Sequence, residues 1–366
     1  MKKNPRYIFI VQFCVLSMLV HGQDEKKSRI PVVPYPQEVH LENGYFSLSE
    51  TPFSILLSGV DDNSAGIISD QLEEVLRIGY ETDLQEAGEG VPTLWIGLPE
   101  KNARLKVLAS EMGILPTGDL GKEGYVLKIE KQAIYILSGG QAGAFYGAMT
   151  LKHLLRGSAP SGELPAMTIR DWPSIGVRCV MDDISRGPIP THDFLKQQIR
   201  RYAEMKINHM SFYIEHVVRT EKYPDMAPSN GGISIGEFKA LSEYAADYHI
   251  QLVGNFQSLG HFEKILSLPQ FRHLGATERM LDPLNPASIN FLGDIYGEMA
   301  PAFSSDYFTP NLDEAWDLSR GGLKGAAAEL GPARIYADHV IKVDSLLRSV
   351  GKKTIVWGDI VLEHPE

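Results

Sequence analysis

The chain has 366 residues, more than one ordinary hydrophobic core organises, so two domains are expected, one of which could be a large barrel. Apolar residues make up 43% and charged residues 22%, a balance that excludes a disordered chain. The net charge of -11 argues against a nucleic-acid partner, because binding to phosphates requires a basic surface.

The first residues predict a secretory signal peptide over residues 1–22. An apolar run over residues 7–20 follows the basic residues Lys2, Lys3 and Arg6, and the small residue Gly22 offers a cleavage point. The run is shorter than the roughly 20 residues of a membrane-spanning helix. We therefore expect an exported protein, periplasmic or extracellular, with no stable membrane span after signal removal.

Residues 23–169 predict a small α+β domain. Residues 125–129 alternate between apolar and polar side chains, and residues 133–137 form a second strand after a polar turn, so a hairpin is expected. Residues 142–155 carry apolar side chains at helical spacing. A small sheet with helices packed on it follows from this pattern.

Residues 170–366 alternate between strands and helices. The predicted strands are residues 176–181, 208–214, 250–255, 307–312 and 354–357. Helices are expected to begin after Thr191, at the capping box of Ser234 and Glu237, at Asn285 and at Ile335. Strand–helix units in series predict a parallel sheet with right-handed crossovers. A closed barrel and an open sheet both fit this pattern.

Polar residues gather just after the ends of these strands. They are Asp182, Asp183, Arg186, Glu215, His216, Gln257, His261, Asp313, Glu314 and Asp359. In a parallel barrel, the carboxyl ends of the strands are where active sites are built. The histidines lack the short spacing of a zinc site, such as His-x-x-x-His, so no metal is predicted.

Several segments resemble glycoside hydrolase family 20. Residues 30–36 read IPVVPYP and residues 142–151 read AGAFYGAMTL, similar to the accessory domain of that family. Arg178 with residues 183–186 resembles its pattern Arg-Gly-x-x-x-Asp-x-Ser-Arg. The resemblance implies an accessory domain over residues 23–169 and a (β/α)8 TIM-type barrel over residues 170–366. Only about five barrel strands are recognisable, so we expect a chain that stops short of a complete barrel.

The resemblance also implies roles for individual residues. Asp313 and Glu314 match the acidic pair after the fourth strand of the family. By the same match, Arg178 holds sugar hydroxyls, His261 lines the substrate pocket and Trp357 walls the pocket of an acetamido group. The family needs neither a metal nor an organic cofactor. Its substrates imply an amino-sugar-containing glycan as the partner of this chain.

The departures from the family pattern concern the surroundings of the acidic pair. The usual signature is His-x-Gly-x-Asp-Glu, whereas residues 309–314 read TPNLDE. Residues 213–216 read YIEH, and Gln257 stands where an aspartate is common. The Tyr-x-Glu-His context is similar to a divergent branch resembling hexosaminidase D. We therefore expect Glu215, His216 and Asp359 to bind substrate beside the acidic pair.

An adjacent Asp-Glu pair suits one particular route of glycoside cleavage. Consecutive side chains near a strand end point in different directions, so they are poorly placed to flank one bond as nucleophile and acid. In the substrate-assisted route the 2-acetamido oxygen attacks the anomeric carbon. Asp313 would then orient the acetamide, and Glu314 would act as acid and base. The predicted function is an exo-acting β-N-acetylhexosaminidase; a non-catalytic carbohydrate-binding barrel and a glycosidase of different specificity are the alternatives.

Overall fold

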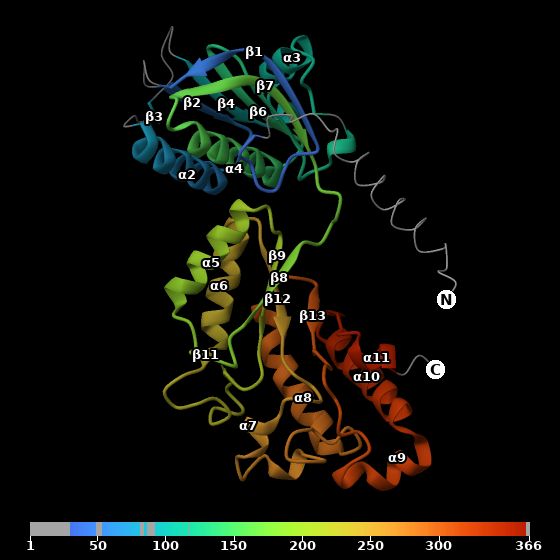
Figure 1. Cartoon of the computed structure of the whole chain (residues 1–366). Coiled ribbons are helices and arrows are strands. Elements are labelled where there is room, and N and C mark those ends of the chain that lie inside the picture. The colour runs from blue at the N-terminus through green and yellow to red at the C-terminus, as the bar shows by residue number, and fades with distance from the viewer. Residues whose placement is uncertain (1–29, 49–52, 81–83, 86–91, 117, 364–366) are drawn as a thin grey trace, which may run out of the picture.

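The computed structural model describes residues 30–48, 53–80, 84–85, 92–116 and 118–363. These residues form two domains, one above the other in Figure 1. The predicted signal peptide over residues 1–22 lies outside the described residues. Within them, no helix combines the length and the apolar character needed to cross a bilayer.

The first domain contains a seven-stranded mixed sheet with the strand order β1-β7-β5-β6-β4-β2-β3. Its strands are β1 (Glu38–Ser47), β2 (Phe53–Ser58), β3 (Leu84–Gln85), β4 (Thr93–Gly97), β5 (Tyr125–Ile129), β6 (Ala133–Ser138) and β7 (Glu163–Asp171). The predicted hairpin is confirmed, because β5 and β6 pair antiparallel. Since β7 continues to Asp171, the sheet extends past the predicted boundary at residue 169.

Helices cover both faces of this sheet. They are α2 (Asp62–Tyr80), α3 (Ala103–Glu111) and α4 (Gln141–Ser158), with 3-10 turns η2 (Pro99–Lys101) and η3 (Gly118–Leu120). The predicted helix at residues 142–155 is confirmed as α4, and most of its residues are buried. α3 packs on the other face, where Leu105 and Ala109 join Val126 and Leu137 in a separate apolar cluster. α2 and α4 therefore lie on the face toward the second domain (Figure 1).

The second domain contains a five-stranded parallel sheet with the order β14-β13-β12-β9-β8. The strands are β8 (Cys179–Asp183), β9 (His209–Tyr213), β12 (Gln251–Asn255), β13 (Tyr307–Thr309) and β14 (Lys353–Thr354). The predicted parallel sheet is confirmed. Among the described residues β8 and β14 form its two edges and do not pair, so the sheet is open.

The helices of the second domain are α5 (His192–Glu204), α6 (Ile235–Asp247), α7 (Glu263–Leu266), α8 (Pro286–Met299), α9 (Lys324–Leu330), α10 (Pro332–Ser349) and α11 (Asp359–Glu363). Three of them, α5, α6 and α8, begin at the predicted signals, whereas α10 begins at Pro332, before the predicted start at Ile335. Short elements between them are β10 (Val218–Arg219), β11 (Ile233–Ser234), η4 (Arg272–Leu274), η5 (Ala300–Ala302) and η6 (Gly321–Leu323). The Thr191 hydroxyl accepts a hydrogen bond from Phe194 N, and the capping box of Ser234 and Glu237 is present.

The last two predicted strands end early, β14 at Thr354 and β13 at Thr309, and the early end of β13 shapes the acidic loop. The sequence predicts a strand over residues 307–312, but β13 ends at Thr309. Pro310 has no N–H to donate to a neighbouring strand. Asn311 and Leu312 then adopt left-handed backbone with φ 57° and 72°. The chain consequently turns away from the sheet before it reaches Asp313.

The two domains meet at the amino ends of the second sheet. Phe145 of α4 packs edge-on against Tyr248 and His249, which follow α6. The buried Lys206 ammonium donates to Asp171 over 2.6 Å and to the Tyr125 hydroxyl over 2.9 Å. Burial lowers the pKa of Lys206, and the attraction of Asp171 opposes that shift. The first domain thus leaves the carboxyl ends of the strands free (Figure 1).

The substitution Lys206→Met tests this interdomain contact. Removing one partner of a buried ion pair leaves the other charge buried without its counterion, so we expect a loss of about 3 kcal/mol in the free energy of unfolding. Urea unfolding followed by circular dichroism measures it. The exposed pair of Lys239 and Glu243 provides the control, because Lys239→Met should cost less than about 0.5 kcal/mol. Equal effects of the two substitutions would contradict the role of Lys206.

Candidate active site

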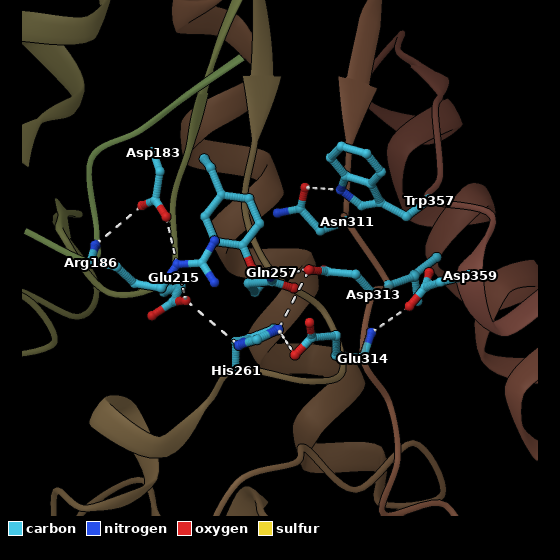
Figure 2. A network of polar contacts seen from close by, with 12 residues as sticks. Asp183, Arg186, Glu215, Gln257, His261, Asn311, Asp313, Glu314, Trp357 and Asp359 are labelled. Atoms are coloured by element: carbon cyan, nitrogen blue, oxygen red, sulfur yellow. Dashed lines mark hydrogen bonds and ion pairs between the residues drawn. The ribbon is translucent and has the colours of Figure 1, made fainter.

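The acidic pair lies in a pocket at the carboxyl ends of the parallel strands. The pocket has a volume of ≈ 380 Å³, and its lining residues are Met181, Asp183, Arg186, Tyr213, Asp313, Glu314, Trp357 and Asp359. Figure 2 shows these polar side chains converging below the ends of β12 and β13. The pocket therefore occupies the position predicted from the strand ends.

Asp313 is held in a fixed position by two neighbouring side chains. The Tyr213 hydroxyl donates to Oδ2 over 3.1 Å, and Gln257 Nε2 donates to Oδ1 over 3.1 Å. Gln257 also donates to the Tyr213 hydroxyl, so the three groups form a closed ring of hydrogen bonds. Burial of the Asp313 carboxyl raises its pKa, but His261 and Gln257 outweigh burial, and the net pKa lies below its usual value. Asp313 is therefore an ionised, oriented carboxylate.

Glu314 is held at its backbone and is much freer at its side chain. Its backbone N–H donates to Asp359 Oδ2 over 2.8 Å, and its φ is 50°. The side chain is 53% exposed, compared with 17% for Asp313. The Leu312 carbonyl accepts from the Tyr336 hydroxyl over 3.2 Å, which fixes the preceding turn. The two consecutive acids therefore differ in the hydrogen bonds that their carboxyl groups accept and in access to solvent.

His261 connects the acidic pair with a third carboxyl group. Its Nε2 lies 3.4 Å from Asp313 Oδ2 and 3.5 Å from Glu314 Oε2, and its Nδ1 lies 3.7 Å from Glu215 Oε1. The nearby Asp313 carboxylate raises the pKa of His261 and outweighs the opposing effect of burial. Burial in turn raises the pKa of Glu215. The structure thus brings four of the predicted site residues together.

Arg186 lines the pocket, although it was predicted only to follow a strand end and not to belong to the site. Its guanidinium bonds to Asp183, lies 3.8 Å from Glu215 Oε1 and stacks 4.7 Å from the centre of the Tyr213 ring. Tyr213 and Gln257 were likewise not assigned. The signal for Arg186 was its position just after β8, at the same end of the sheet as Asp313.

Arg178 does not lie in this pocket, so the prediction that it holds a sugar there does not agree with its position. The residue precedes β8, at the opposite end of the strand from Asp183. Its guanidinium bonds to Glu123 of the first domain and donates from Nε to the Lys206 carbonyl over 2.8 Å. Arg178 is therefore part of the interdomain contact.

The remaining predicted residues have separate placements. Trp357 lines the pocket, and its indole Nε1 donates to Asn311 Oδ1 over 3.4 Å. Asp359 also lines it and supports the backbone of Glu314. His216 is not among the lining residues, and burial lowers the pKa of its imidazole. The structure therefore brings Trp357 and Asp359 to the acidic pair and leaves His216 outside the pocket.

Several buried polar atoms around the pocket have no hydrogen-bond partner among the described residues. They include Glu215 Oε1, Gln257 Oε1, His261 Nε2 and Asp359 Oδ1. Buried polar atoms are rarely left without partners in folded proteins. The site can therefore receive hydrogen bonds from a polar ligand. The part of the chain that the structure describes contains no group of three or more His, Cys, Asp and Glu side chains placed to hold a metal.

Comparison with known families identifies the first domain. Residues 29–172 match the family described as "Glycosyl hydrolase family 20, domain 2". This match spans the mixed sheet and its helices, from before β1 to just after β7. The segments that resembled the accessory domain lie within it.

Curated relatives extend the similarity across both domains. A β-hexosaminidase of Porphyromonas gingivalis is 22% identical over 95% of this chain and 48% of its own length. Subunit A1 of a Dictyostelium discoideum β-hexosaminidase is 24% identical over 96% of this chain and 66% of its own length. The chain therefore spans about half to two thirds of these relatives.

Solved structures share the fold. A Flavobacterium johnsoniae chitobiase superimposes with a TM-score of 0.70 at 22% identity, covering 90% of this chain and 53% of that one. A Streptomyces plicatus N-acetyl-β-hexosaminidase in complex with thio-NAglucal gives 0.71 at 21% identity, covering 91% and 66%. Residues 29–172 therefore match domain 2 of glycoside hydrolase family 20, and the chain as a whole is similar to these β-hexosaminidases and shares the fold of the solved structures.

Proposed function

We propose that this chain belongs to an exo-acting glycoside hydrolase that removes terminal β-linked N-acetylglucosamine or N-acetylgalactosamine. The observation that carries the proposal is that two adjacent acids differ in their hydrogen bonds and in their exposure to solvent. The Asp313 carboxylate is largely buried and hydrogen-bonded, whereas the Glu314 side chain is half exposed, and both approach the same nitrogen of His261. The pocket volume of ≈ 380 Å³ lies at the small end of ligand sites and suits a single sugar unit.

The placement of the acids supports substrate-assisted retention. An ordinary retaining enzyme needs two carboxyl groups on opposite faces of the scissile bond, about 5 Å apart. Here both carboxyl groups come from consecutive residues of one loop and lie beside one imidazole nitrogen, which favours complementary roles for them over nucleophile and acid on opposite faces of one bond. The 2-acetamido oxygen then serves as the nucleophile, and an oxazolinium intermediate forms as the leaving group departs.

Asp313 is suited to orient the acetamido group. Its ionised carboxylate accepts the amide N–H of the substrate and stabilises the positive charge that develops in the oxazolinium ion. The hydrogen bonds from Tyr213 and Gln257 fix its position before the substrate arrives. A preorganised charge needs no rearrangement at the moment of reaction, which is why the closed ring of hydrogen bonds favours this role.

Glu314 is suited to move protons. Its exposed carboxyl can donate a proton to the leaving oxygen and, after the leaving group departs, accept one from water. His261 lies 3.5 Å from Glu314 Oε2, and its positive charge stabilises the ionised acid after proton transfer. The raised pKa of His261 keeps that charge present at slightly acidic pH.

The surrounding residues are suited to bind the rest of the sugar. Arg186, fixed by Asp183, can donate to hydroxyls, and Trp357 can wall the acetamido pocket. We further propose that the open sheet belongs to a (β/α)8 barrel and that the protein is exported, as its N-terminal sequence predicts. The likeness to the hexosaminidase D branch stays a prediction.

The substitution Glu314→Gln tests the proton-transfer role. We expect kcat/KM for chitobiose to fall by about 10²–10⁴, because a general acid supplies that factor. The loss should be smaller for 2,4-dinitrophenyl β-N-acetylglucosaminide, whose leaving group needs little protonation. Glu329→Gln on the exposed surface of α9 is the matched control and should keep wild-type rates. Equal rates for wild type and Glu314→Gln would remove Glu314 from the reaction, and no turnover of either β-hexosaminide by wild type would favour a binding protein.

The substitution Asp313→Asn tests the role of the acetamide. A thiazoline mimic of the oxazolinium ion should inhibit the wild type competitively, and Asp313→Asn should weaken its binding at least about tenfold, because a charge-assisted hydrogen bond is lost. 4-Nitrophenyl β-glucoside lacks the acetamide and should not be cleaved. Cleavage of the glucoside at a rate similar to the acetamido sugar, without thiazoline inhibition, would indicate an ordinary two-carboxylate glycosidase.

The pairing of His261 with Asp313 predicts a pH dependence of stability. The raised pKa of His261 adds stability that is lost as pH rises through that pKa, and the lowered pKa of Asp313 adds stability that is lost as pH falls through its own. The stability difference between wild type and His261→Gln should therefore be largest between about pH 4 and 6.5. Thermal unfolding at pH 3, 5.5 and 9 measures it. His40→Gln, on the exposed surface of β1, is the control, and a difference that is flat with pH would argue against the pair.

A further inference from the structure

The carboxamides of Asn255 and Asn311 form a reciprocal pair beneath the acidic loop. Asn311 Nδ2 donates to Asn255 Oδ1 over 2.7 Å, and Asn255 Nδ2 donates to Asn311 Oδ1 over 3.1 Å. Both residues are fully buried. Hydrogen bonds shielded from water are strong, and leaving one partner unsatisfied is costly. The pair therefore fixes the relative positions of β12 and the turn after β13.

The same pair receives hydrogen bonds from neighbouring strand ends. Asn255 Oδ1 accepts from Ile214 N over 3.1 Å, at the end of β9. Asn311 Oδ1 accepts from the Thr309 hydroxyl over 3.3 Å and from Trp357 Nε1 over 3.4 Å. The backbone carbonyl of Asn311 accepts from Trp357 N over 3.1 Å. One buried residue thus connects the acidic loop with the tryptophan that lines the pocket (Figure 2).

Asn311 also begins the turn that presents the two acids. Its backbone is left-handed, with φ 57°, and asparagine tolerates this conformation better than most other residues. Its backbone N–H donates to the Thr309 hydroxyl over 3.2 Å, which stabilises the turn. Because Asn311 is fully buried, it cannot itself contact a substrate in the pocket.

We propose that Asn311 is a positioning residue for the reaction. Through its carboxamide it holds the Trp357 indole in the pocket wall and fixes the turn from which Asp313 and Glu314 project. This inference rests on the proposed function, since the residues that Asn311 positions are the proposed catalytic acids and the tryptophan of the pocket wall. It assigns to Asn311 a role that depends on the side chain as well as on the backbone conformation.

The comparison of Asn311→Gly with Asn311→Ala separates these two contributions. Glycine adopts the left-handed backbone without strain but lacks the carboxamide, whereas alanine loses the carboxamide and is strained as well. We expect both variants to lower kcat/KM for 4-nitrophenyl β-N-acetylglucosaminide by about tenfold or more, the equivalent of one net hydrogen bond. A displaced acidic loop lowers kcat, and a loosened Trp357 raises KM. Wild-type kcat and KM in a folded Asn311→Gly variant would overturn the proposal.

A second measurement follows Trp357 without relying on turnover. In protein labelled with ¹⁵N at the tryptophan indoles, the Trp357 signal is assigned by its loss in Trp357→Phe. We expect Asn311→Gly to shift this signal and to accelerate exchange of its proton with water. An unchanged signal would overturn the proposed anchoring. His249→Gly, also at a left-handed position but at the amino end of β12, is the control and should change neither the signal nor the kinetics.

The two measurements distinguish the possible failures. If the wild type cleaves no β-hexosaminide while the Trp357 signal responds to Asn311→Gly, the proposed function fails and the anchoring of the tryptophan stands. If the wild type is active and Asn311→Gly is equally active, the positioning role fails and the proposed function stands. Circular dichroism confirms in each case that the variants are folded.

Discussion

The buried pairing of Asn255 with Asn311 is the constraint on which the arrangement of the site depends. These amides lie at the carboxyl end of the parallel sheet, where each strand would otherwise end independently. The pair also accepts hydrogen bonds from the end of β9 and from the segment after β14. The residues beneath the pocket are therefore linked by hydrogen bonds from one strand end to the next. The acids above them are held in addition by Tyr213, Gln257 and Asp359. A site supported by buried hydrogen bonds retains its geometry better than one carried by loops alone.

The position of the first domain complements this arrangement. It packs against the amino ends of the parallel strands through Lys206, Asp171 and the ring of Phe145. Arg178 belongs to the same contact, since it reaches Glu123 of the first domain. The interdomain contact and the pocket thus lie at opposite ends of one sheet, as stabilising contacts and active sites do in parallel barrels. Substitutions that strengthen the interdomain contact can therefore be made without altering the pocket.

Strand ends were the most informative feature of the sequence. The expectation that polar residues after parallel strands meet in space places Asp313, Glu314 and Asp359 correctly beside the pocket. Arg178 was instead assigned by the family resemblance; it precedes β8, whereas Arg186 of the same pattern follows the strand. The left-handed turn was also not predicted, since Asn311 and Leu312 continue an apparently extended segment. The family signature has glycine at the position of Asn311, and the observed φ explains how asparagine takes its place. The amide pair could not be foreseen, because Asn255 and Asn311 are far apart in the sequence.

The charges around the pocket support the proposed chemistry. The carboxyl groups of Asp183, Glu215, Asp313, Glu314 and Asp359 outnumber the basic groups of Arg186 and His261. Arg186 is held by Asp183, so its charge is largely compensated within the protein. A ligand in the pocket consequently experiences a negative potential. Such a potential repels anionic sugars and stabilises the positive charge that develops at an anomeric carbon or in an oxazolinium ion. Because Asp313 is ionised and fixed, the part of that potential closest to an acetamido group is already in place before any bond breaks.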